Sequence, residues 1–280
     1  AYSLEGVKNV QRFEDKLARF TNTKHAIATN SGTSALETSL LALGIGTSHT
    51  VIIPSLTFVA TANAVVSVGA RPVFCDVDEY GQIDYEKCRK LSSILNPKCI
   101  ILVDLYGRIS KDAIRFQNLA PYVIEDSCQA LGTEKAGTYG DVGCFSFYAS
   151  KVMTTGGLGG AIITKHDHIA QNLKLKRNHG IHEGQTITPG RNNIMNEMNA
   201  AFGCVQIDKL PDFIQKRNDR MRFLGLYENT NGYIGTILRE DRDSLKERLH
   251  QKDIGAATYY DKPIHHHSFY KNDLDLPMTE

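Results

Sequence analysis

The chain has 280 residues, of which 41% are hydrophobic and 22% charged, and its 32 basic side chains nearly balance 31 acidic ones. This composition is typical of a globular protein with a hydrophobic core, organised as one large domain or two ordinary ones. The balanced charge gives no electrostatic reason to expect nucleic acid or a membrane as a partner. No apolar run approaches the roughly 20 residues that span a bilayer, and no basic-then-apolar leader opens the sequence.

Two residue types bear on compartment and metal binding. The six cysteines form no CxxC pair and lie mostly in apolar runs, so we expect buried free thiols in a reducing cytoplasm. The run His265–His267 resembles a metal site or a tag remnant. Three adjacent histidines cannot all face one ion from a regular element, and we therefore expect no metal site.

The first predicted element is an amphipathic helix, because apolar residues recur at three- and four-residue steps from Val7 to Phe20, behind a candidate cap at Ser3. Short apolar runs then alternate with helical patterns. This alternation favours an α/β fold with a mainly parallel sheet covered by helices on both faces. The strand-like runs are 25–30, 50–55, 71–77, 99–105, 122–126, 141–147 and 159–164, and the helical ones are 33–44 and 58–69.

A long helical pattern extends from Met195 to about Glu228, and Pro211 predicts a break or kink within it. The stretch 232–260 then reads as strand, helix and strand, which is too little to build a layer with its own core. We therefore expect a large domain at residues 1–210 and an incomplete, smaller C-terminal α/β domain at residues 211–280.

The segment Asn30–Leu36 places small and hydroxylated residues at the start of a predicted helix. Free backbone N–H groups and hydroxyls at such a helix start can hold a phosphate. Simple capping by Ser31 or Thr33 explains the same residues equally well.

Asp126 ends an apolar strand, where an unpaired charge costs several kcal/mol. A protonated pyridine nitrogen would be a suitable partner. Alternatively, Asp126 caps a helix that begins at Ser127 or Cys128.

Lys151 lies between a strand-like run and a glycine-rich turn. It is either a solvated loop lysine or an amine that attacks a carbonyl. Together, a phosphate cradle, an acid for an aromatic nitrogen and an amine for an aldehyde describe pyridoxal phosphate (PLP).

A chain of motifs from about Gln11 to Tyr270 supports this reading. The sequence resembles the DegT/DnrJ/StrS-type PLP-dependent sugar aminotransferases of fold type I, and this resemblance implies that fold with a smaller C-terminal α/β domain. The motifs are FEDKLARFTNTKHAIATNSGTSAL, VIIPSLTFVATANAV, GARPVFCDVD, VIEDSCQALG, GDVGCFSFYASK, RNHGI and GRNNIMNEMNAAFG, in the order found in the family.

The resemblance implies a role for several residues. Lys151 would be the catalytic lysine that holds the cofactor covalently, and Asp126 would pair with the pyridine nitrogen. Gln129 would meet the cofactor's 3-hydroxyl side, and Phe58 would stack on the ring. Because related sugar dehydratases have histidine in place of Lys151, the resemblance favours amino transfer.

The phosphate would be held by Gly32, Thr33, Ser34 and Ser146. Asn192 matches an asparagine that reaches the phosphate from the neighbouring subunit. The resemblance therefore implies a homodimer with a shared active site.

The implied reaction moves an amino group from an amino acid, L-glutamate by resemblance, to a keto group of a nucleotide-linked deoxysugar. Arg177, Asn178 and His179 are candidates for contact with the sugar nucleotide, although basic residues at a helix end also serve only to match the helix dipole.

The sequence also departs from the family pattern. TTGGLGG replaces the usual TTGEGG after Lys151, Asp104 stands where histidine is common, and LGTEKAGTYGD is shortened. Relative to the family, the chain begins late and stops before most of the final domain. Two alternatives therefore stay open: amino transfer to a cyclitol or other non-sugar ketone, and a non-catalytic regulatory protein of the same fold.

Overall fold

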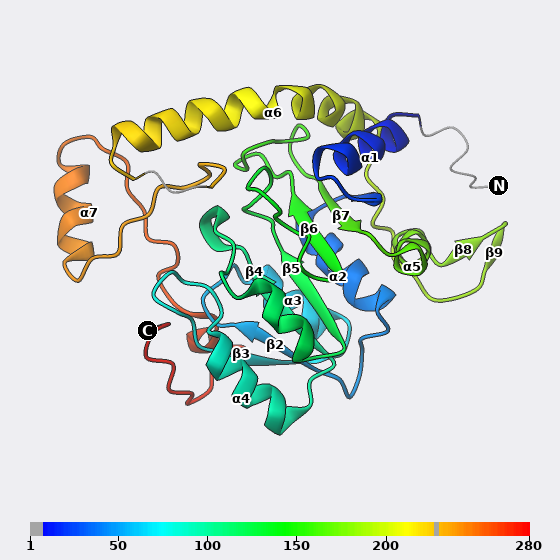
Figure 1. The fold of residues 1–280 in the computed structure, drawn as a ribbon, viewed down its shortest axis with the longest axis horizontal. Coiled ribbons are helices and arrows are strands. Elements are labelled where there is room, and N and C mark those ends of the chain that lie inside the picture. Colours follow the sequence, from blue (N-terminus) through cyan, green and yellow to red (C-terminus); the bar gives the residue numbers. More distant parts are fainter. Residues whose placement is uncertain (1–7, 227–229) are drawn as a thin grey trace.

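Seven strands form one sheet between two layers of helices in the computed structural model, which describes residues 8–226 and 230–280 (Figure 1). The strand order is β1-β7-β6-β5-β4-β2-β3. Among the described residues, only β7 runs antiparallel to its neighbours in this sheet. The expected mainly parallel sheet is therefore confirmed. Its strands are β1 (His25–Thr29), β2 (Thr50–Pro54), β3 (Arg71–Cys75), β4 (Cys99–Val103), β5 (Tyr122–Asp126), β6 (Val142–Ser146) and β7 (Gly160–Thr164).

Helices cover both faces because successive strand residues point to opposite sides of the sheet. In β2, Ile53 packs in the core cluster that contains α2, α3 and α5, whereas Ile52 packs with Cys88 of α4 on the other face. Near β1, β6 and β7 this second face is covered by α1 and α6. The helices are α1 (Lys8–Phe20), α2 (Gly32–Ala42), α3 (Ala60–Ser67), α4 (Tyr85–Leu95), α5 (Asp167–Arg177) and α6 (Glu197–Phe223).

Helix α1 confirms the first predicted element. Val10, Phe13 and Leu17 are buried and Phe20 is partly buried. Ser3 and Val7, with which that prediction began, lie outside the described residues.

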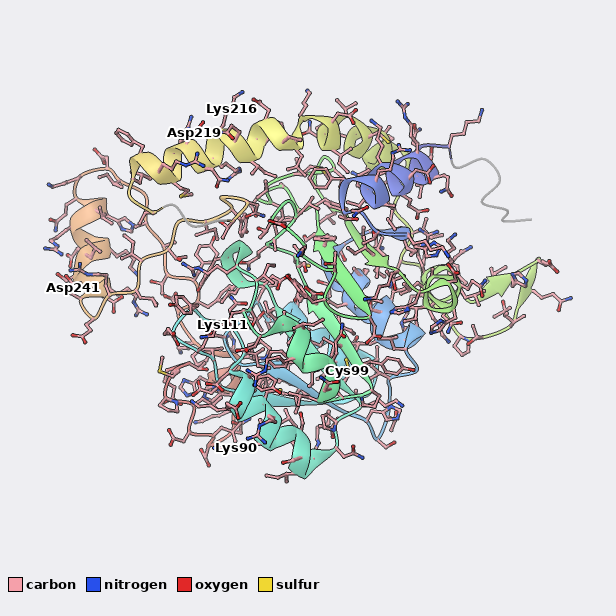
Figure 2. All side chains as sticks on the ribbon, in the orientation of Figure 1. Lys90, Cys99, Lys111, Lys216, Asp219 and Asp241 are labelled. Carbon is pink, nitrogen blue, oxygen red and sulfur yellow. The ribbon has the colours of Figure 1, made fainter. Side chains whose placement is uncertain are left out.

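Helix α6 continues through Pro211, so a break there is wrong, whereas a kink stays a prediction. All of its buried residues lie between Ala200 and Leu210. The second half carries charged side chains on its outer surface, including Lys216 and Asp219 (Figure 2). Because the expected domain boundary at 210/211 falls inside one helix, the division into two domains stays a prediction.

The C-terminal stretch contains the predicted helix, α7 (Arg242–His250), which buries no side chain. The two strands predicted around it are wrong: no strand is assigned between residues 230 and 280. Neither segment has a neighbouring strand to supply backbone hydrogen bonds, and an isolated strand is not stable in water. The remaining short elements are η1 (Leu105–Gly107), η2 (Ala113–Asn118), β8 (Ile181–His182), β9 (Gln185–Thr186) and η3 (Ile264–His266).

All six cysteines are free thiols, and all are buried except the partly exposed Cys128. Within residues 8–226 and 230–280, no helix has both the length and the apolar character needed to cross a bilayer.

Candidate active site

A cavity of about 430 Å³ lies at the carboxyl edge of the sheet. Because six of the seven strands run in the same direction, the residues that follow β1, β2, β5 and β6 meet at this edge. Ligand sites of open α/β sheets form at such edges. The cavity brings together most of the residues predicted from the sequence: Gly32, Thr33, Phe58, Asp126, Gln129, Ser146 and Lys151.

Lys151 lies in the connection between β6 and the antiparallel β7, which turns back at the cavity. Val152 and Met153, directly after it, are buried in the core and anchor this loop. The turn that follows places Gly157 at φ 134°, a conformation that side chains other than glycine rarely adopt. Lys151 therefore lines the cavity from a loop that the buried Val152 and Met153 hold in place.

The Lys151 ammonium group contacts Tyr233. Its Nζ lies 3.4 Å from the Tyr233 hydroxyl and 4.9 Å from the centre of that ring. Among the described residues, Lys151 forms no salt bridge with a carboxylate. The amine is thus held beside an aromatic ring and is available to a ligand in the cavity.

Asp126, at the end of β5, is 7% exposed and lines the same cavity. Its Oδ2 accepts a 2.8 Å hydrogen bond from the Thr61 hydroxyl, and its Oδ1 accepts a 3.3 Å bond from the Cys128 amide. Turns rather than a helix follow Asp126, so the alternative of a helix cap is wrong. In the described part of the chain this carboxylate has no cationic side chain as a partner, although burial of an unpaired charge is costly.

The phosphate end is formed by the start of α2. A Cβ atom added to Gly32 would lie 2.9 Å from Ser146 Cβ and 2.8 Å from Cys128 Sγ, so the helix start and the end of β6 approach closely only because residue 32 is glycine. Ser31 Oγ accepts a 3.0 Å hydrogen bond from the Ser34 amide and caps the helix. Capping by Ser31 is therefore confirmed, and Ser34 takes part in the cap without lining the cavity.

Phe58 and Gln129 also line the cavity, and both lie next to Tyr260. The Phe58 ring is 56% exposed and lies 6.3 Å from the Tyr260 ring. Gln129 accepts a 2.8 Å hydrogen bond from the Tyr106 amide and donates a 3.1 Å bond to the Tyr260 hydroxyl. The Gln129 side chain is thus fixed before any ligand binds.

Besides Ser34, four predicted residues do not line the cavity. Arg177 is buried, pairs with Glu14 and donates a 2.8 Å hydrogen bond to the Ala28 carbonyl. Asn178 is also buried, whereas His179 and Asn192 are exposed. The substrate and cofactor roles expected for Arg177, Asn178, His179 and Asn192 stay predictions.

Burial governs the ionisation of two neighbouring groups. It raises the pKa of the Asp104 carboxyl well above its usual range, and Glu125 raises it further. It also raises the pKa of the Cys128 thiol. Asp104, the residue that replaces the family's usual histidine, accepts a hydrogen bond from Ser127 directly beside Asp126.

Several residues of the site were not predicted. Thr61 is the hydroxyl donor to Asp126, and the TFVAT sequence offered a signal, since Thr57 and Thr61 lie four residues apart at a helix start and bond to each other at 2.9 Å. Tyr233 and Tyr260 come from the C-terminal stretch, where no apolar pattern marks them.

The sequence model of the DegT/DnrJ/EryC1/StrS aminotransferase family matches residues 3–230. The chain belongs to this family. The resemblance inferred from the motifs is therefore confirmed.

Two curated relatives illustrate the family's activities. GDP-perosamine synthase of Caulobacter vibrioides is 35% identical over 254 residues, covering 85% of this chain and 66% of the relative. The UDP-4-amino-4,6-dideoxy-N-acetyl-beta-L-altrosamine transaminase of Campylobacter jejuni is 32% identical, covering 97% of this chain and 80% of the relative. The chain thus spans two thirds to four fifths of their length.

Solved structures of family members share the fold. A DegT/DnrJ/EryC1/StrS aminotransferase from Brucella abortus has a TM-score of 0.88 at 33% identity, covering 96% of this chain and 80% of that one. NtdA from Bacillus subtilis, solved with bound cofactor PMP, has a TM-score of 0.81 at 27% identity over 97% of this chain and 69% of that one. Fold type I is confirmed.

The DegT family of aminotransferases uses PLP, and the cavity fits this cofactor. Asp126 supplies a buried carboxylate without a cationic partner, and Lys151 supplies an amine without an acidic one. The start of α2 and the Ser146 hydroxyl meet at the distance that Gly32 permits. These groups suit the protonated ring nitrogen, the aldehyde and the phosphate respectively.

Proposed function

We infer that this protein is a PLP-dependent aminotransferase that moves an amino group from L-glutamate to a keto group of a nucleotide-linked deoxysugar. One observation carries this proposal: Lys151 and Asp126 line the same cavity, and neither has an oppositely charged partner in the described chain. The names of the two relatives, a GDP-perosamine synthase and a UDP-linked amino-sugar transaminase, support the class of acceptor.

Each side chain has a distinct task. PLP, when bound, supplies the electron sink that lets a proton leave the substrate carbon. Lys151 would hold the cofactor, and its freed Nζ would move that proton from the substrate's α-carbon to the cofactor's aldehyde-derived carbon, a contribution of roughly 10²–10⁴-fold. Asp126 keeps the ring nitrogen protonated, and the hydrogen bond from Thr61 orients Asp126.

The remaining groups position the cofactor. Gly32, Thr33 and Ser146 hold the phosphate, and Ser34 assists by fixing the cap at Ser31. Phe58 covers the ring, and Gln129 faces the 3-hydroxyl side.

The proposal includes a homodimer with a shared site, in which Asn192 reaches the partner's cofactor. Asn192 is exposed and does not line the cavity of its own chain. On α6, Met198, Phe202 and Val205 form an exposed apolar stripe at helical spacing. Phe202 lies against Gly156, in the loop that carries Lys151. A partner that covers this stripe would also contact the loop that carries Lys151.

The decisive experiment is an absorption spectrum of the PLP-loaded protein, followed by borohydride reduction and peptide mapping. We expect a yellow protein whose reduced pyridoxyl group maps to Lys151. Lys151→Ala should lose the label and amino transfer, whereas Lys174→Ala, at an exposed position on α5, should keep both. Full activity in Lys151→Ala would contradict the assignment.

Glutamate distinguishes the alternative functions. An aminotransferase loses its visible band when glutamate is added, and a regulatory protein of the same fold does not. A panel of keto sugars linked to GDP, UDP or TDP, beside cyclitol ketones, then separates sugar from non-sugar acceptors.

A further inference from the structure

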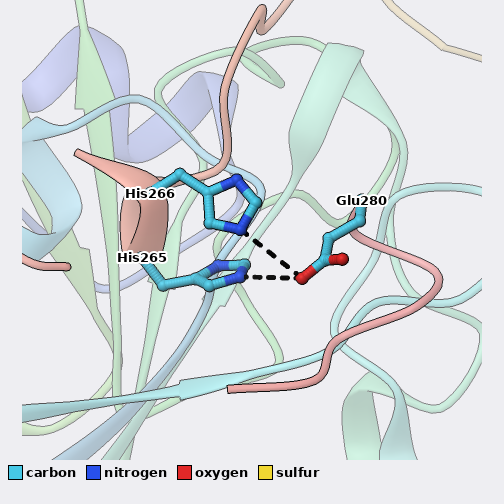
Figure 3. A group of neighbouring side chains, drawn as sticks. All are labelled: His265, His266 and Glu280. Carbon is cyan, nitrogen blue, oxygen red and sulfur yellow. Dashed lines mark hydrogen bonds and ion pairs between the residues drawn. The ribbon is translucent and has the colours of Figure 1, made fainter. Parts of the chain in front are cut away.

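Three potential metal ligands lie close together beside the loop that follows β2. His265 and His266 belong to η3, and both imidazole rings point toward the carboxylate of Glu280 (Figure 3). Glu280 Oε1 lies 3.2 Å from His265 Nε2 and 3.5 Å from His266 Nε2. One ligand atom from each residue lies within 4.8 Å of the other two.

The two separations between Glu280 and the histidines match those between neighbouring ligands of a zinc ion. Zinc binds imidazole nitrogen and carboxylate oxygen at about 2.0–2.2 Å in a tetrahedron, which places neighbouring ligand atoms about 3.3–3.6 Å apart. Two imidazoles and one carboxylate also suit zinc better than magnesium or calcium, which prefer oxygen ligands. The side chains of His266 and Glu280 are 44% and 40% exposed, so water can complete the tetrahedron.

The ligands are held in place by groups outside the cluster. The fully buried His265 contacts Ser55 Oγ through Nδ1 at 2.6 Å, which leaves Nε2 directed at Glu280. Such a contact on the second ring nitrogen is the usual support of a metal-binding histidine. Next to Glu280, the Thr279 amide and hydroxyl donate bonds of 2.8 and 2.7 Å to the buried Asp76.

We propose that His265, His266 and Glu280 bind one Zn²⁺ ion that fastens the C-terminal segment to the sheet. The ion is structural, because the cluster lies outside the cavity. Its position has a consequence for the active site: Ser55 also accepts a 2.9 Å hydrogen bond from the Ile264 amide through its carbonyl, and it begins the loop that carries Phe58. By holding this loop in place, zinc also stabilises the part of the cavity wall that Phe58 forms.

The test uses the full chain, without an added histidine tag, after treatment with a chelator. Zinc affinity is measured by competition with a chromophoric chelator, and the melting temperature is recorded with and without ZnCl₂. We expect one zinc per chain and a higher melting temperature with zinc. Cobalt(II) should give the strong visible absorption of a tetrahedral site.

Two exposed ligands and one exposed neighbour provide matched variants. His266→Ala and Glu280→Gln should each weaken zinc binding at least about tenfold, whereas His267→Ala should bind zinc as the unmodified chain does. No zinc uptake, or equal affinity in His266→Ala and His267→Ala, would overturn the proposal. Because neither measurement depends on amino transfer, failure here leaves the proposed enzymatic function untouched.

Discussion

The Thr61 hydroxyl donates a 2.8 Å hydrogen bond to Oδ2 of Asp126, across the boundary between the start of α3 and the end of β5. Both residues are buried, and Thr61 is fully so. Since the Cys128 amide bonds only weakly to the other oxygen, at 3.3 Å, Thr61 provides the main contact that orients this carboxylate. The geometry offered to a pyridine nitrogen thus depends on a residue far from Asp126 in the sequence.

The first prediction removes this hydrogen bond. Thr61→Val keeps the side-chain shape but leaves Asp126 Oδ2 without its donor, and a hydrogen bond to a charged group contributes about 1.5–3 kcal/mol. We expect PLP to bind at least about tenfold more weakly, as measured by fluorescence titration. Thr61→Ser, which retains the hydroxyl, should bind PLP nearly as the unmodified chain does. Equal affinities in the Val and Ser variants would show that Asp126 needs no such support.

The second prediction concerns Gly32, where an added side chain would fill the narrow space between the helix start and its neighbours. In Gly32→Ala the new Cβ would lie 2.8 Å from Cys128 Sγ and 2.9 Å from Ser146 Cβ. Alanine improves helix propensity by up to about 1 kcal/mol, but overpacking costs about 1–3 kcal/mol, so we expect lower stability and weaker PLP retention. The control is Gly255→Ala, whose Cβ meets nothing within 4 Å. Urea unfolding measures the stability, and the PLP content after dialysis measures retention of the cofactor. A stable variant with full PLP content would contradict the role of Gly32 in the phosphate site.

Local patterns predicted the strands well because each buried strand is a short apolar run. Strand direction is not encoded in this way: GGAIIT reads like the other runs, yet β7 is antiparallel, because the connection 147–159 contains no crossover helix and turns back on itself. The wrong predictions for the C-terminal strands and for Pro211 have a similar cause, because a local pattern does not show which neighbours a segment will have. The segments around α7 have strand-like composition but no neighbouring strand to pair with. Pro211 is exposed and directly follows the last buried residue of α6, so the packed first half of the helix already fixes its path there.

The candidate site was predictable where a residue directly follows a strand or carries a motif, as Asp126 and Lys151 do. Thr61, Tyr233 and Tyr260 were missed because tertiary packing alone brings them to the cavity. Arg177 shows what local patterns leave out: the sequence offers a basic residue at a helix end, and the fold pairs it with Glu14 in the interior, so its substrate role stays a prediction. The spacing of residues in the sequence does not show that Arg177 pairs with a residue of α1.

The third prediction concerns pH. Glu125 is fully buried, and burial raises its pKa from 4.5 to about 7, although the Gly137 and Gly140 amides donate hydrogen bonds to it. Between these pH values the folded protein holds a proton that the unfolded chain releases, so this group makes the protein less stable as the pH rises. The full effect is about 3 kcal/mol, reached above pH 7.

Glu125→Gln removes this titration because glutamine does not ionise, and it also removes the contribution of Glu125 to the raised pKa of Asp104. The free energy of unfolding of the unmodified chain, relative to the variant, should fall as the pH is raised from 4.5 to 7 and then level off. Urea unfolding at a series of pH values measures the difference. Glu134→Gln, at an exposed position, should follow the unmodified chain throughout. A constant difference between Glu125→Gln and the unmodified chain would contradict the raised pKa.

The last prediction tests the shared site by mixing subunits. Asn192→Ala removes the side chain proposed to reach the partner's cofactor, but it keeps the backbone carbonyl that accepts a 3.2 Å hydrogen bond from Asn30, so the fold should persist. We expect this variant to lose PLP more readily and Lys151→Ala to be inactive. In a mixed dimer of the two variants, one site combines an intact Lys151 with an intact Asn192. An equal mixture should therefore recover up to about a quarter of the unmodified activity, since half of the dimers are mixed and each has one intact site. Activity no higher than the average of the two separate variants would place Asn192 in its own subunit's site or in none.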